Sequence, residues 1–508
     1  MEGHKAAVLV IAACVKGFHA QQRPFRIYHG STTSTRRSHL RRDEMVDTSL
    51  LTRILDIDVA NRVALVEPNV PMDRLVEATT KHGLLPPVVM EFPGITVGGG
   101  FAGTAGESSS FKYGLFEHTM ASVEVVLANG DVVHASSTDN PDLFYGIASS
   151  FGTLGVVTLL ELRLIASKPY VMLKSIPVRS IEEAVSVIEL ATSHESIDYV
   201  DGIMYGRECR IIFEGRLVDT IATGTPVRTF TRPEDPWFYL NAKDATKNCE
   251  RTVTEAIPIV DYLFRYDRGA FWVGWYAFKY FKLPFNRVTR WLLDRFMHTR
   301  VMVHALHKSG LSDQYIAQDV GIPYPKVPEF FQFIEKEFGF FPIWLCPVNV
   351  RGPSNQFSPA TSTDRVDKLI NFGVWGPGSR DQRKFVLSNR LIERKVYELG
   401  GVKCLYAHAY YTATEFWEIY GRQSYEKLRS KYHASYLPSV YEKVKVDLPS
   451  EERDSNTSLL ASLLALFWKI WPLAALYGVL HAIKGGDYLL PHQHPWAPKS
   501  LWKSTKSL

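Results

Sequence analysis

The chain has 508 residues, of which 46% are hydrophobic and 22% charged. This length exceeds what a single hydrophobic core usually organises, so we expect at least two domains. Lysine and arginine number 58 against 53 aspartates and glutamates, and the resulting charge of +5 is too small to indicate nucleic-acid binding. The five cysteines are dispersed without CxxC spacing, which argues against a disulfide framework or a structural zinc site and favours a reducing compartment. No metal site is predicted.

The N-terminal segment, residues 6–15, is an apolar run behind Lys5 and looks like the hydrophobic part of a signal peptide. No clean small-residue cleavage site follows it, and the chain continues directly into a strand pattern from Phe25 to Tyr28. We therefore expect a short amphipathic helix beside the first strand, and no secretion signal.

Strand and helix patterns then alternate as far as residue 165, which is typical of an α+β unit. Asn129-Gly130 is a strong turn signal between the two strands of a hairpin. Lys168-Pro169 marks a junction, so the first domain is predicted to span residues 1–168. The expected elements are a strand Arg62–Glu67, a helix Met72–His82, a hairpin of Ser122–Leu127 with Asp131–Ala135, and a strand Val156–Ile165.

Residues 169–447 are predicted to form a second, mixed α/β domain. Aromatic residues are dense between Pro236 and Trp344. They are typical of a well-packed core, and they also suit an apolar pocket for a bulky, flat substrate. The expected elements are helices Ile181–Thr192, Phe330–Phe338 and Arg390–Leu399, and buried strands Pro342–Pro347 and Cys404–Tyr411.

The C-terminal region is predicted to consist of a polar linker (448–457), a membrane-associated apolar segment (458–484) and a basic tail (485–508). Leu459 to Leu480 is long enough for a membrane span of about 20 residues, but Lys469 and Pro472 interrupt it. We therefore favour a Pro-kinked helix that is either re-entrant or interfacial, with the catalytic body in the cytosol. The alternative is an amphipathic helix packed on the surface of the enzyme itself.

Two polar, glycine-rich loops are candidates for a cofactor site. The first follows the first strand and reads HGSTTSTR from His29 to Arg36, and the second spans residues 92–118 and contains seven glycines. Glycine lets the backbone approach a ligand closely, and successive N–H groups and hydroxyls can bind phosphate or the edge of a flavin. Either loop alone is also consistent with ordinary turns. Neither matches the GxGxxG of a Rossmann fold or the GxxxxGK[ST] of a P-loop.

Taken in order, these motifs resemble a known family. The hydroxyl-rich loop is followed by TVGGG, GESSSFKYG, VVLANGDVV and FGTLGVVTLLELRL, and further on by RGAFW and IWLCP. This pattern resembles the FAD-binding PCMH-type domain of the vanillyl-alcohol-oxidase superfamily. Within that superfamily it is similar to the Δ24-sterol reductase (Diminuto/seladin) family, from about residue 10 to about residue 445.

The resemblance implies an α+β fold in which a two-subdomain PCMH-type FAD-binding domain precedes a mixed α/β substrate domain and a C-terminal apolar helix. It implies that FAD is held without a covalent bond, because Ser31 and Thr32 follow Gly30 where covalent members of the superfamily place a histidine. The residues that would hold FAD are Gly30, Ser31, Thr32, Thr33, Ser34, Thr35, Arg36, Gly98, Gly99, Gly100, Thr104, Gly106, Glu107, Ser108, Ser109, Ser110, Lys112, Tyr113, Gly114, Gly152, Thr153 and Gly155.

The activity implied is reduction of a side-chain carbon–carbon double bond of a sterol, with NADPH as hydride source, at the endoplasmic reticulum membrane. An isolated alkene accepts hydride only when a proton is also delivered, so a general acid is needed in a dry pocket. Tyr406, His408 and Tyr410 are the candidates, on one expected strand, and Tyr406 is favoured. Arg268 is interpreted as a cofactor contact or a surface ion-pair member. Two alternatives remain: an alcohol oxidase or dehydrogenase of the same fold, and a membrane-tethered flavin-binding protein without catalysis.

Overall fold

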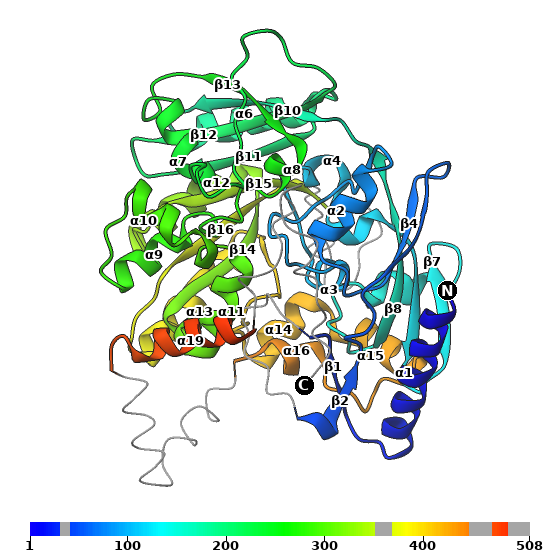
Figure 1. The fold of residues 1–508 in the computed structure, drawn as a ribbon. Helices are drawn as coiled ribbons and strands as arrows, with labels where there is room; N and C mark the ends of the chain where they lie inside the picture. The colour runs from blue at the N-terminus through cyan, green and yellow to red at the C-terminus, as the bar shows by residue number, and fades with distance from the viewer. Residues whose placement is uncertain (31–40, 351–367, 447–469, 486–508) are drawn as a thin grey trace.

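The computed structural model describes residues 1–30, 41–350, 368–446 and 470–485. Two antiparallel sheets, with helices packed on them, lie side by side (Figure 1), which confirms the α+β class. The first unit has a five-stranded sheet in the order β3-β4-β8-β6-β7. Its strands are β3 (Ile54–Asp58), β4 (Val63–Val66), β6 (Met120–Leu127), β7 (Val132–Ser136) and β8 (Gly155–Arg163), with two small pairs, β1 (Arg26–Tyr28) with β2 (Met45–Asp47) and β5 (Leu84–Leu85) with β9 (Ile165–Ala166).

Local signals in the sequence predict most of the helices and strands of this first unit. The hairpin of β6 and β7 turns at Asn129-Gly130 as predicted, and Gly130 has a φ of +86° that favours glycine. The expected N-terminal helix is α1 (Glu2–Ala20), whose Val8, Ile11 and Val15 are buried. The remaining helices of the unit are α2 (Met72–Thr80), α3 (Val97–Ala102), α4 (Ser110–Tyr113) and α5 (Pro141–Ile147).

The second unit is built on an eight-stranded sheet in the order β13-β10-β12-β11-β15-β16-β14-β17. Helices α6, α12 and α13 pack on this sheet and enclose a second hydrophobic core. The strands are β10 (Tyr170–Pro177), β11 (Tyr199–Met204), β12 (Arg210–Val218), β13 (Val253–Pro258), β14 (Tyr315–Pro323), β15 (Ile343–Asn349), β16 (Lys368–Pro377) and β17 (Val402–Lys403). The helices are α6 (Ile181–Ser193), α7 (Phe238–Ala245), α8 (Ile259–Leu263), α9 (Val273–Tyr280), α10 (Arg287–Leu292), α11 (Thr299–Ser309), α12 (Val327–Glu337) and α13 (Gln382–Glu398).

Two expectations for the second unit are wrong. No strand forms over Cys404–Tyr411, because β17 ends at Lys403 and the chain then turns at Leu405 and Tyr406. A buried ion pair between Lys403 and Glu393 interrupts strand pairing there, because Tyr410 donates its N–H to Glu393 rather than to a neighbouring strand. The second error concerns the cysteines, since Cys209 and Cys249 form a disulfide across 40 residues. The cysteine pattern therefore no longer favours a reducing compartment.

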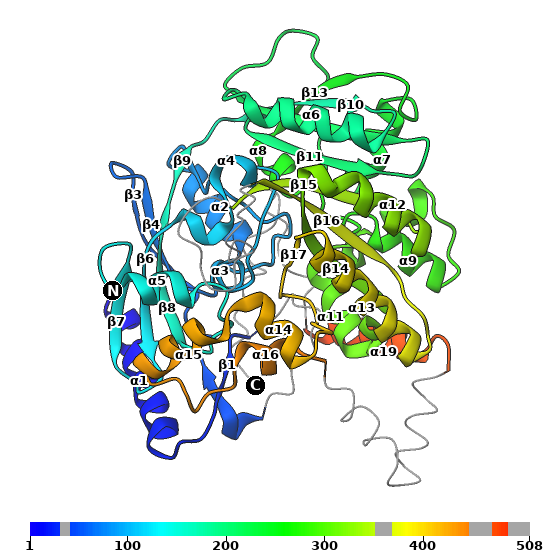
Figure 2. The ribbon, with the colours of Figure 1, turned by 180° about the vertical axis from the view of Figure 1, so that it is seen from behind.

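The last helices of the main body return to the first unit, as Figure 2 shows from behind. They are α14 (Ala413–Tyr420), α15 (Arg422–Lys431) and α16 (Val440–Val444). The hydroxyl of Tyr425 donates to the Thr153 hydroxyl at 2.7 Å, and Lys443 donates to the carbonyl of Phe151 at 2.6 Å. Residues 413–446, which the sequence places in the second domain, thus tie the two units together.

The described part of the C-terminal segment is α19 (Leu473–Gly485), which packs on α11. At Gly478 the two helices are in close contact, since a Cβ there would lie 2.2 Å from the carbonyl oxygen of Ala305. The helix therefore lies on the enzyme's own surface, which was the alternative interpretation of this segment. Residues 459–469 lie outside the described residues. Among the described helices, none has the length and apolar character needed to cross a bilayer.

Candidate active site

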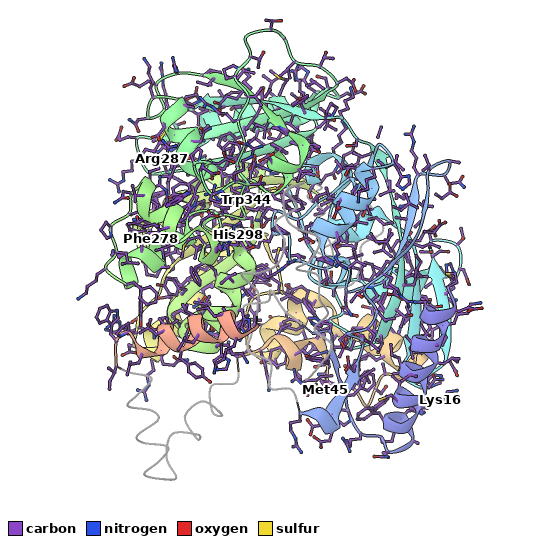
Figure 3. All side chains as sticks on the ribbon, viewed as in Figure 1. Lys16, Met45, Phe278, Arg287, His298 and Trp344 are labelled. Atoms are coloured by element: carbon purple, nitrogen blue, oxygen red, sulfur yellow. A yellow bond between two sulfur atoms is a disulfide. The ribbon has the colours of Figure 1, made fainter. Side chains whose placement is uncertain are left out.

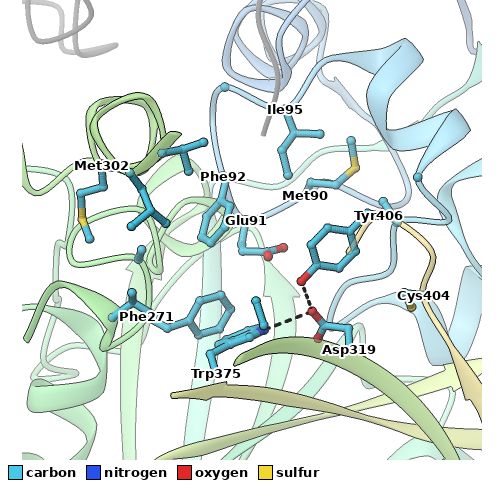
Figure 4. Close-up of a pocket in the computed structure, with 18 of the residues that line it drawn as sticks. Met90, Glu91, Phe92, Ile95, Phe271, Met302, Asp319, Trp375, Cys404 and Tyr406 are labelled. Atoms are coloured by element: carbon cyan, nitrogen blue, oxygen red, sulfur yellow. Dashed lines mark hydrogen bonds between the residues drawn. The ribbon is translucent and has the colours of Figure 1, made fainter. Parts of the chain in front are cut away.

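A cavity of about 520 Å³ lies between the two units (Figure 4), and Ala475 and Val479 of α19 also line it. Its volume is within the range of small-molecule and cofactor sites. Three walls enclose it: the second glycine loop of the first unit, the strands β14 to β16 of the second unit, and the helices α9, α11 and α19. The cavity is therefore a candidate site for a cofactor and a substrate together.

Backbone forms the wall on the side of the first unit. Gly99 and Gly103 line the cavity there, and a Cβ at Gly103 would lie 2.8 Å from the carbonyl oxygen of Gly99. Helix α3 begins at this wall, where the Thr96 hydroxyl accepts a hydrogen bond from the Gly99 N–H at 3.1 Å. A wall without side chains lets a flat ring approach the peptide groups closely. The residues present therefore fit a flavin.

The predicted FAD residues fall into three groups. Gly99, Gly100, Thr104 and Gly106 line the cavity. A second group does not line it: Gly98, Glu107, Ser108, Ser109, Ser110, Lys112, Tyr113, Gly114, Gly152, Thr153 and Gly155. Gly30 has a φ of +87° and borders the third group, Ser31 to Arg36, which lies outside the described residues.

The second group shapes the loop. Ser109 donates to the carbonyl of Pro87 at 2.8 Å, and the Ser110 hydroxyl accepts from the Glu107 N–H at 2.8 Å. Lys112 forms an ion pair with Asp198 of the second unit at 2.9 Å. The SSSFK motif thus holds the glycine loop against the neighbouring sheet, a role that its composition does not reveal.

A polar cluster faces the glycine wall from the second sheet. Asp319 lies on β14 and accepts hydrogen bonds from Asn371 at 3.0 Å, from Trp375 at 3.2 Å and from the hydroxyl of Tyr406. Asn371 and Trp375 flank Gly373, the β16 partner of Asp319, and therefore lie on the same face of the sheet. Cys404 donates its N–H to the carbonyl of Asp319 at 2.9 Å, which places Tyr406 beside that carboxyl.

This environment keeps the phenol protonated. Burial and the neighbouring Asp319 raise the pKa of Tyr406 well above its usual value. Burial likewise raises the pKa of Asp319, although the hydrogen bonds from Tyr406, Asn371 and Trp375 oppose the shift. Of the three candidate acids, only Tyr406 lines the cavity. The carbonyl of His408 accepts a hydrogen bond from Lys403, and Tyr410 donates its N–H to Glu393.

Glu91 and Asp319 also line the cavity, and neither was predicted from the sequence. The Glu91 carboxyl and the Tyr406–Asp319 pair face the same space in Figure 4. Burial and the adjacent carboxyl of Glu107 raise the pKa of Glu91 well above its usual value, which favours its protonated form. A signal existed for both residues, because each is an isolated acid at or within an apolar run, and such residues are seldom buried without a reason.

Arg268 has neither of its predicted roles. It is buried, it donates to Asp294 at 2.7 Å, and it does not line the cavity. It is therefore a structural member of a buried ion pair.

Beyond the polar cluster the cavity becomes apolar. Both interpretations of the aromatic-rich region hold, because Trp237 and Trp272 are buried in the core whereas other rings line the cavity. The apolar part, here called the apolar lobe, is lined by Phe271, Val273, Tyr276, Ala277, Tyr280, Phe281, Phe296, Met297, Val301, Met302, Ala305, Leu306, Leu311, Tyr315, Ala475 and Val479. A bulky apolar ligand fits such a lining.

A glycine wall, a protonated phenol and an adjoining apolar lobe define the site of an FAD-dependent oxidoreductase. Residues 9–136 match the FAD binding domain family. The chain is 30% identical over 394 residues to a Delta(24)-sterol reductase of Homo sapiens, covering 77% of this chain and 76% of that relative. It is 29% identical over 441 residues to the Delta(24)-sterol reductase of Arabidopsis thaliana, covering 80% and 77%. A Delta(24)-sterol reductase homolog of Caenorhabditis elegans is 27% identical over 419 residues, with 78% of each chain covered. The chain belongs to the Delta(24)-sterol reductase family.

Proposed function

We propose that this protein reduces a side-chain carbon–carbon double bond of a sterol, of the Δ24 type, with NADPH as the source of hydride. The observation that carries the proposal is the single cavity that the glycine wall, the apolar lobe and Tyr406 all line. The names of the relatives supply the substrate class. Glycines at the wall and apolar side chains in the lobe suit a flavin at one end and a sterol at the other.

Different residues of the chain have different roles in this reaction. Bound FAD supplies hydride transfer, and Gly99 and Gly106 give it a wall that it can approach. Tyr406 donates the proton to the alkene carbon that does not receive the hydride, so that one hydride and one proton are added across the double bond. Asp319 accepts the hydrogen bond of the phenol in the structure, so the O–H turns from Asp319 toward the alkene when the proton is transferred. The apolar lobe excludes water, which would otherwise compete for the proton.

Incubation with NADPH and a panel of unsaturated sterols tests this proposal. We expect mass analysis to show products that have gained one hydride and one proton, and NADPH to bleach the flavin without oxygen. A protein whose flavin is not reduced by NADPH, but is reduced by an alcohol and reoxidised by oxygen, would be the oxidase of the same fold. An unreactive flavin would indicate the non-catalytic binder.

FAD is proposed to be bound without a covalent link. Acid precipitation should then release the yellow cofactor into the supernatant. A yellow pellet would instead indicate a covalent link. His29 would then be the candidate residue, because it lines the cavity beside the first loop and is the histidine nearest in sequence to the predicted covalent position.

We place the enzyme at the endoplasmic reticulum membrane with its catalytic body in the cytosol, because a sterol substrate resides in membranes. Fractionation followed by protease treatment of intact microsomes tests both parts. Protection of the catalytic body from protease would place it in the lumen. The lumen is an oxidising compartment, in which the Cys209–Cys249 disulfide would also be stable.

A further inference from the structure

One helix of the second unit has its apolar residues on the outside. Helix α10 buries none of its residues, and Val288, Trp291 and Leu292 are 63%, 51% and 64% exposed. Monomeric soluble proteins seldom expose large apolar side chains in a group, and such groups mark interaction sites. The outward surface of α10 is therefore suited to contact something other than water.

Helix α19 continues this surface. Its inner side is buried on α11, while Leu476, Tyr477 and Leu480 are exposed on its outer side. The indole of Trp471, just before α19, donates to the carbonyl of Tyr280 at the end of α9 at 2.9 Å. Figure 1 shows α9, α10 and α19 along the same side of the molecule, and Figure 2 shows α9 and α19 on the same side from behind. We call this surface the apolar face; its exposed residues are Trp275, Leu283, Val288, Trp291, Leu292, Ile470, Trp471, Leu476, Tyr477, Leu480 and Ile483.

Positive charge surrounds the apolar face. Residues 273–310 and 470–485 contain eight lysines and arginines and a single acid, Asp294, which is buried and paired with Arg268. Figure 3 shows Arg287 at the outer edge of the molecule, on the side of α10. The basic residues are Lys279, Lys282, Arg287, Arg290, Arg295, Arg300, Lys308 and Lys484. Arg300 is paired with Asp73 at 3.4 Å, and the other seven basic residues leave these segments with an excess of positive charge. This combination of tryptophans, leucines and positive charge suits the interface of an anionic bilayer.

The same helices separate this surface from the cavity. Tyr276, Ala277 and Tyr280 of α9 line the apolar lobe from within, as do Ala475 and Val479 of α19. Trp275 and Leu480 on the same two helices are exposed on the outside. Only the thickness of one helix, about 10 Å, therefore separates the apolar face from the apolar lobe.

We propose that the apolar face docks on the surface of a bilayer that contains anionic lipid, and that the substrate passes from the bilayer into the apolar lobe between α9 and α19. The evidence for docking is the set of exposed apolar residues and the basic residues around them. The route of the substrate rests on the proposed function as well. Docking through this face requires no helix that crosses the bilayer, because an interfacial surface is inserted only about 5–10 Å deep.

Sedimentation with vesicles tests the docking on the full-length, FAD-loaded protein. The variant carries Trp291→Glu and Leu292→Glu, neither of which lines the cavity, and the matched control carries Leu387→Glu and Leu391→Glu on the exposed side of α13. We expect the wild type and the control to bind vesicles of phosphatidylcholine with phosphatidylserine. The variant should bind at least about tenfold more weakly, because two large apolar groups no longer leave water. Salt, or omission of phosphatidylserine, should weaken the binding of the wild type.

Equal binding of variant and wild type would overturn the docking, as would a wild type that binds neither kind of vesicle. If the wild type is a dimer in solution, the variant a monomer, and neither binds vesicles, the apolar face is an interface between copies of this chain and the proposal is wrong.

Delivery of the sterol tests its route. We expect the variant to lose kcat/KM with sterol embedded in vesicles and to keep it with sterol supplied in cyclodextrin. An equal loss with both kinds of delivery, or no loss with either, would overturn the route. Failure of the proposed function would look different, because the wild type would then reduce no sterol in either form while its vesicle binding could still be measured.

Discussion

Tyr406 combines the two properties that a proton donor in a dry cavity needs. Its raised pKa keeps the proton on the phenol at neutral pH, and its hydrogen bond to Asp319 fixes the direction of the ring. Glu91 faces the same space and its pKa is also raised, so the two residues are competing candidates that substitution can separate.

For Tyr406→Phe we expect reduction of the alkene to slow by about 10²–10⁴-fold, since only this step consumes the proton. Reduction of the flavin by NADPH should stay within a small factor of the wild type. Stopped-flow measurement of the two half-reactions checks this, with Tyr410→Phe as a control that does not line the cavity. If Glu91→Gln alone showed the selective loss, Glu91 would be the donor instead.

Gly99→Val should abolish FAD loading while the protein stays folded. A Cβ at residue 99 lies 3.1 Å from the Thr96 hydroxyl, and the branched side chain would occupy the space that the cofactor approaches. Flavin absorbance per protein, together with the far-UV CD spectrum, provides the measurement. Gly17→Val is the matched control, because a Cβ there meets nothing within 4 Å. Full occupancy in folded Gly99→Val would show that this wall does not contact FAD.

Among the secondary-structure elements, buried pairs of charged side chains hold the walls of the cavity in place. Lys403 and Glu393 form an ion pair at 2.5 Å with almost no exposure, and Lys403 also donates to the carbonyl of His408. Asp267 accepts the N–H of Thr299 at the first turn of α11 and contacts His298 at 2.5 Å. An anion is stabilising at this end of a helix. The loop of Tyr406 and the helix beside the apolar lobe therefore both depend on buried pairs.

Lys403→Met should lower the free energy of unfolding by about 3–5 kcal/mol, because it leaves the Glu393 carboxylate buried without its cation. Adding Glu393→Leu should recover most of the loss, since neither charge then needs a partner. Chemical denaturation of the two variants gives the comparison. A double variant as unstable as Lys403→Met would mean that Lys403 acts mainly through the carbonyl of His408.

His298 should make stability depend on pH. Burial alone would lower its pKa, but the carboxylates of Asp267 and Asp294 raise the pKa of His298 to about 9. A raised folded-state pKa means that protonation favours the folded state. Its contribution is therefore complete below the unfolded value of 6.5 and is lost as pH rises through about 9. Unfolding measured between pH 6 and 10 should show this decline, and His298→Gln should flatten it. An unchanged slope in the variant would assign the decline to other groups.

At the scale of the whole molecule, the two units and the C-terminal helix form one cavity that none of them could enclose alone. The glycine wall comes from the first unit, the proton donor from the second, and part of the apolar lobe from α19. Residues 413–446 hold the two units together by returning to the first.

Deletion of residues 470–508 should therefore weaken binding of the sterol without affecting binding of FAD. We expect FAD loading to remain near that of the wild type, because α19 contributes no residue to the glycine wall. The KM for the sterol should rise at least about tenfold as the apolar lobe opens to water. Flavin content and steady-state kinetics with cyclodextrin-delivered sterol check both parts. An unchanged KM would show that α19 is not a wall of the working substrate site.

Strong local signals in the sequence are sufficient to predict several elements and the family. The hairpin at Asn129-Gly130, the helix α6 and the strand β15 follow from turn chemistry and apolar spacing within about a dozen residues. The motif order identified a flavin-binding fold because those glycines and hydroxyls are consecutive in the chain. All of this information is local, and so it can be read without knowing how distant segments pack.

Which residues meet in the cavity depends on contacts between distant segments of the chain. Tyr406 is distinguished from His408 and Tyr410 by its contact with Asp319, 87 residues away, and the expected strand that carried all three is absent. The Cys209–Cys249 disulfide and the packing of α19 on α11 likewise join segments that are distant in sequence. No local pattern encodes such contacts, because they depend on which faces the two sheets present to each other. The site is therefore a property of the assembled units, whereas the cofactor class is already visible in one stretch of chain.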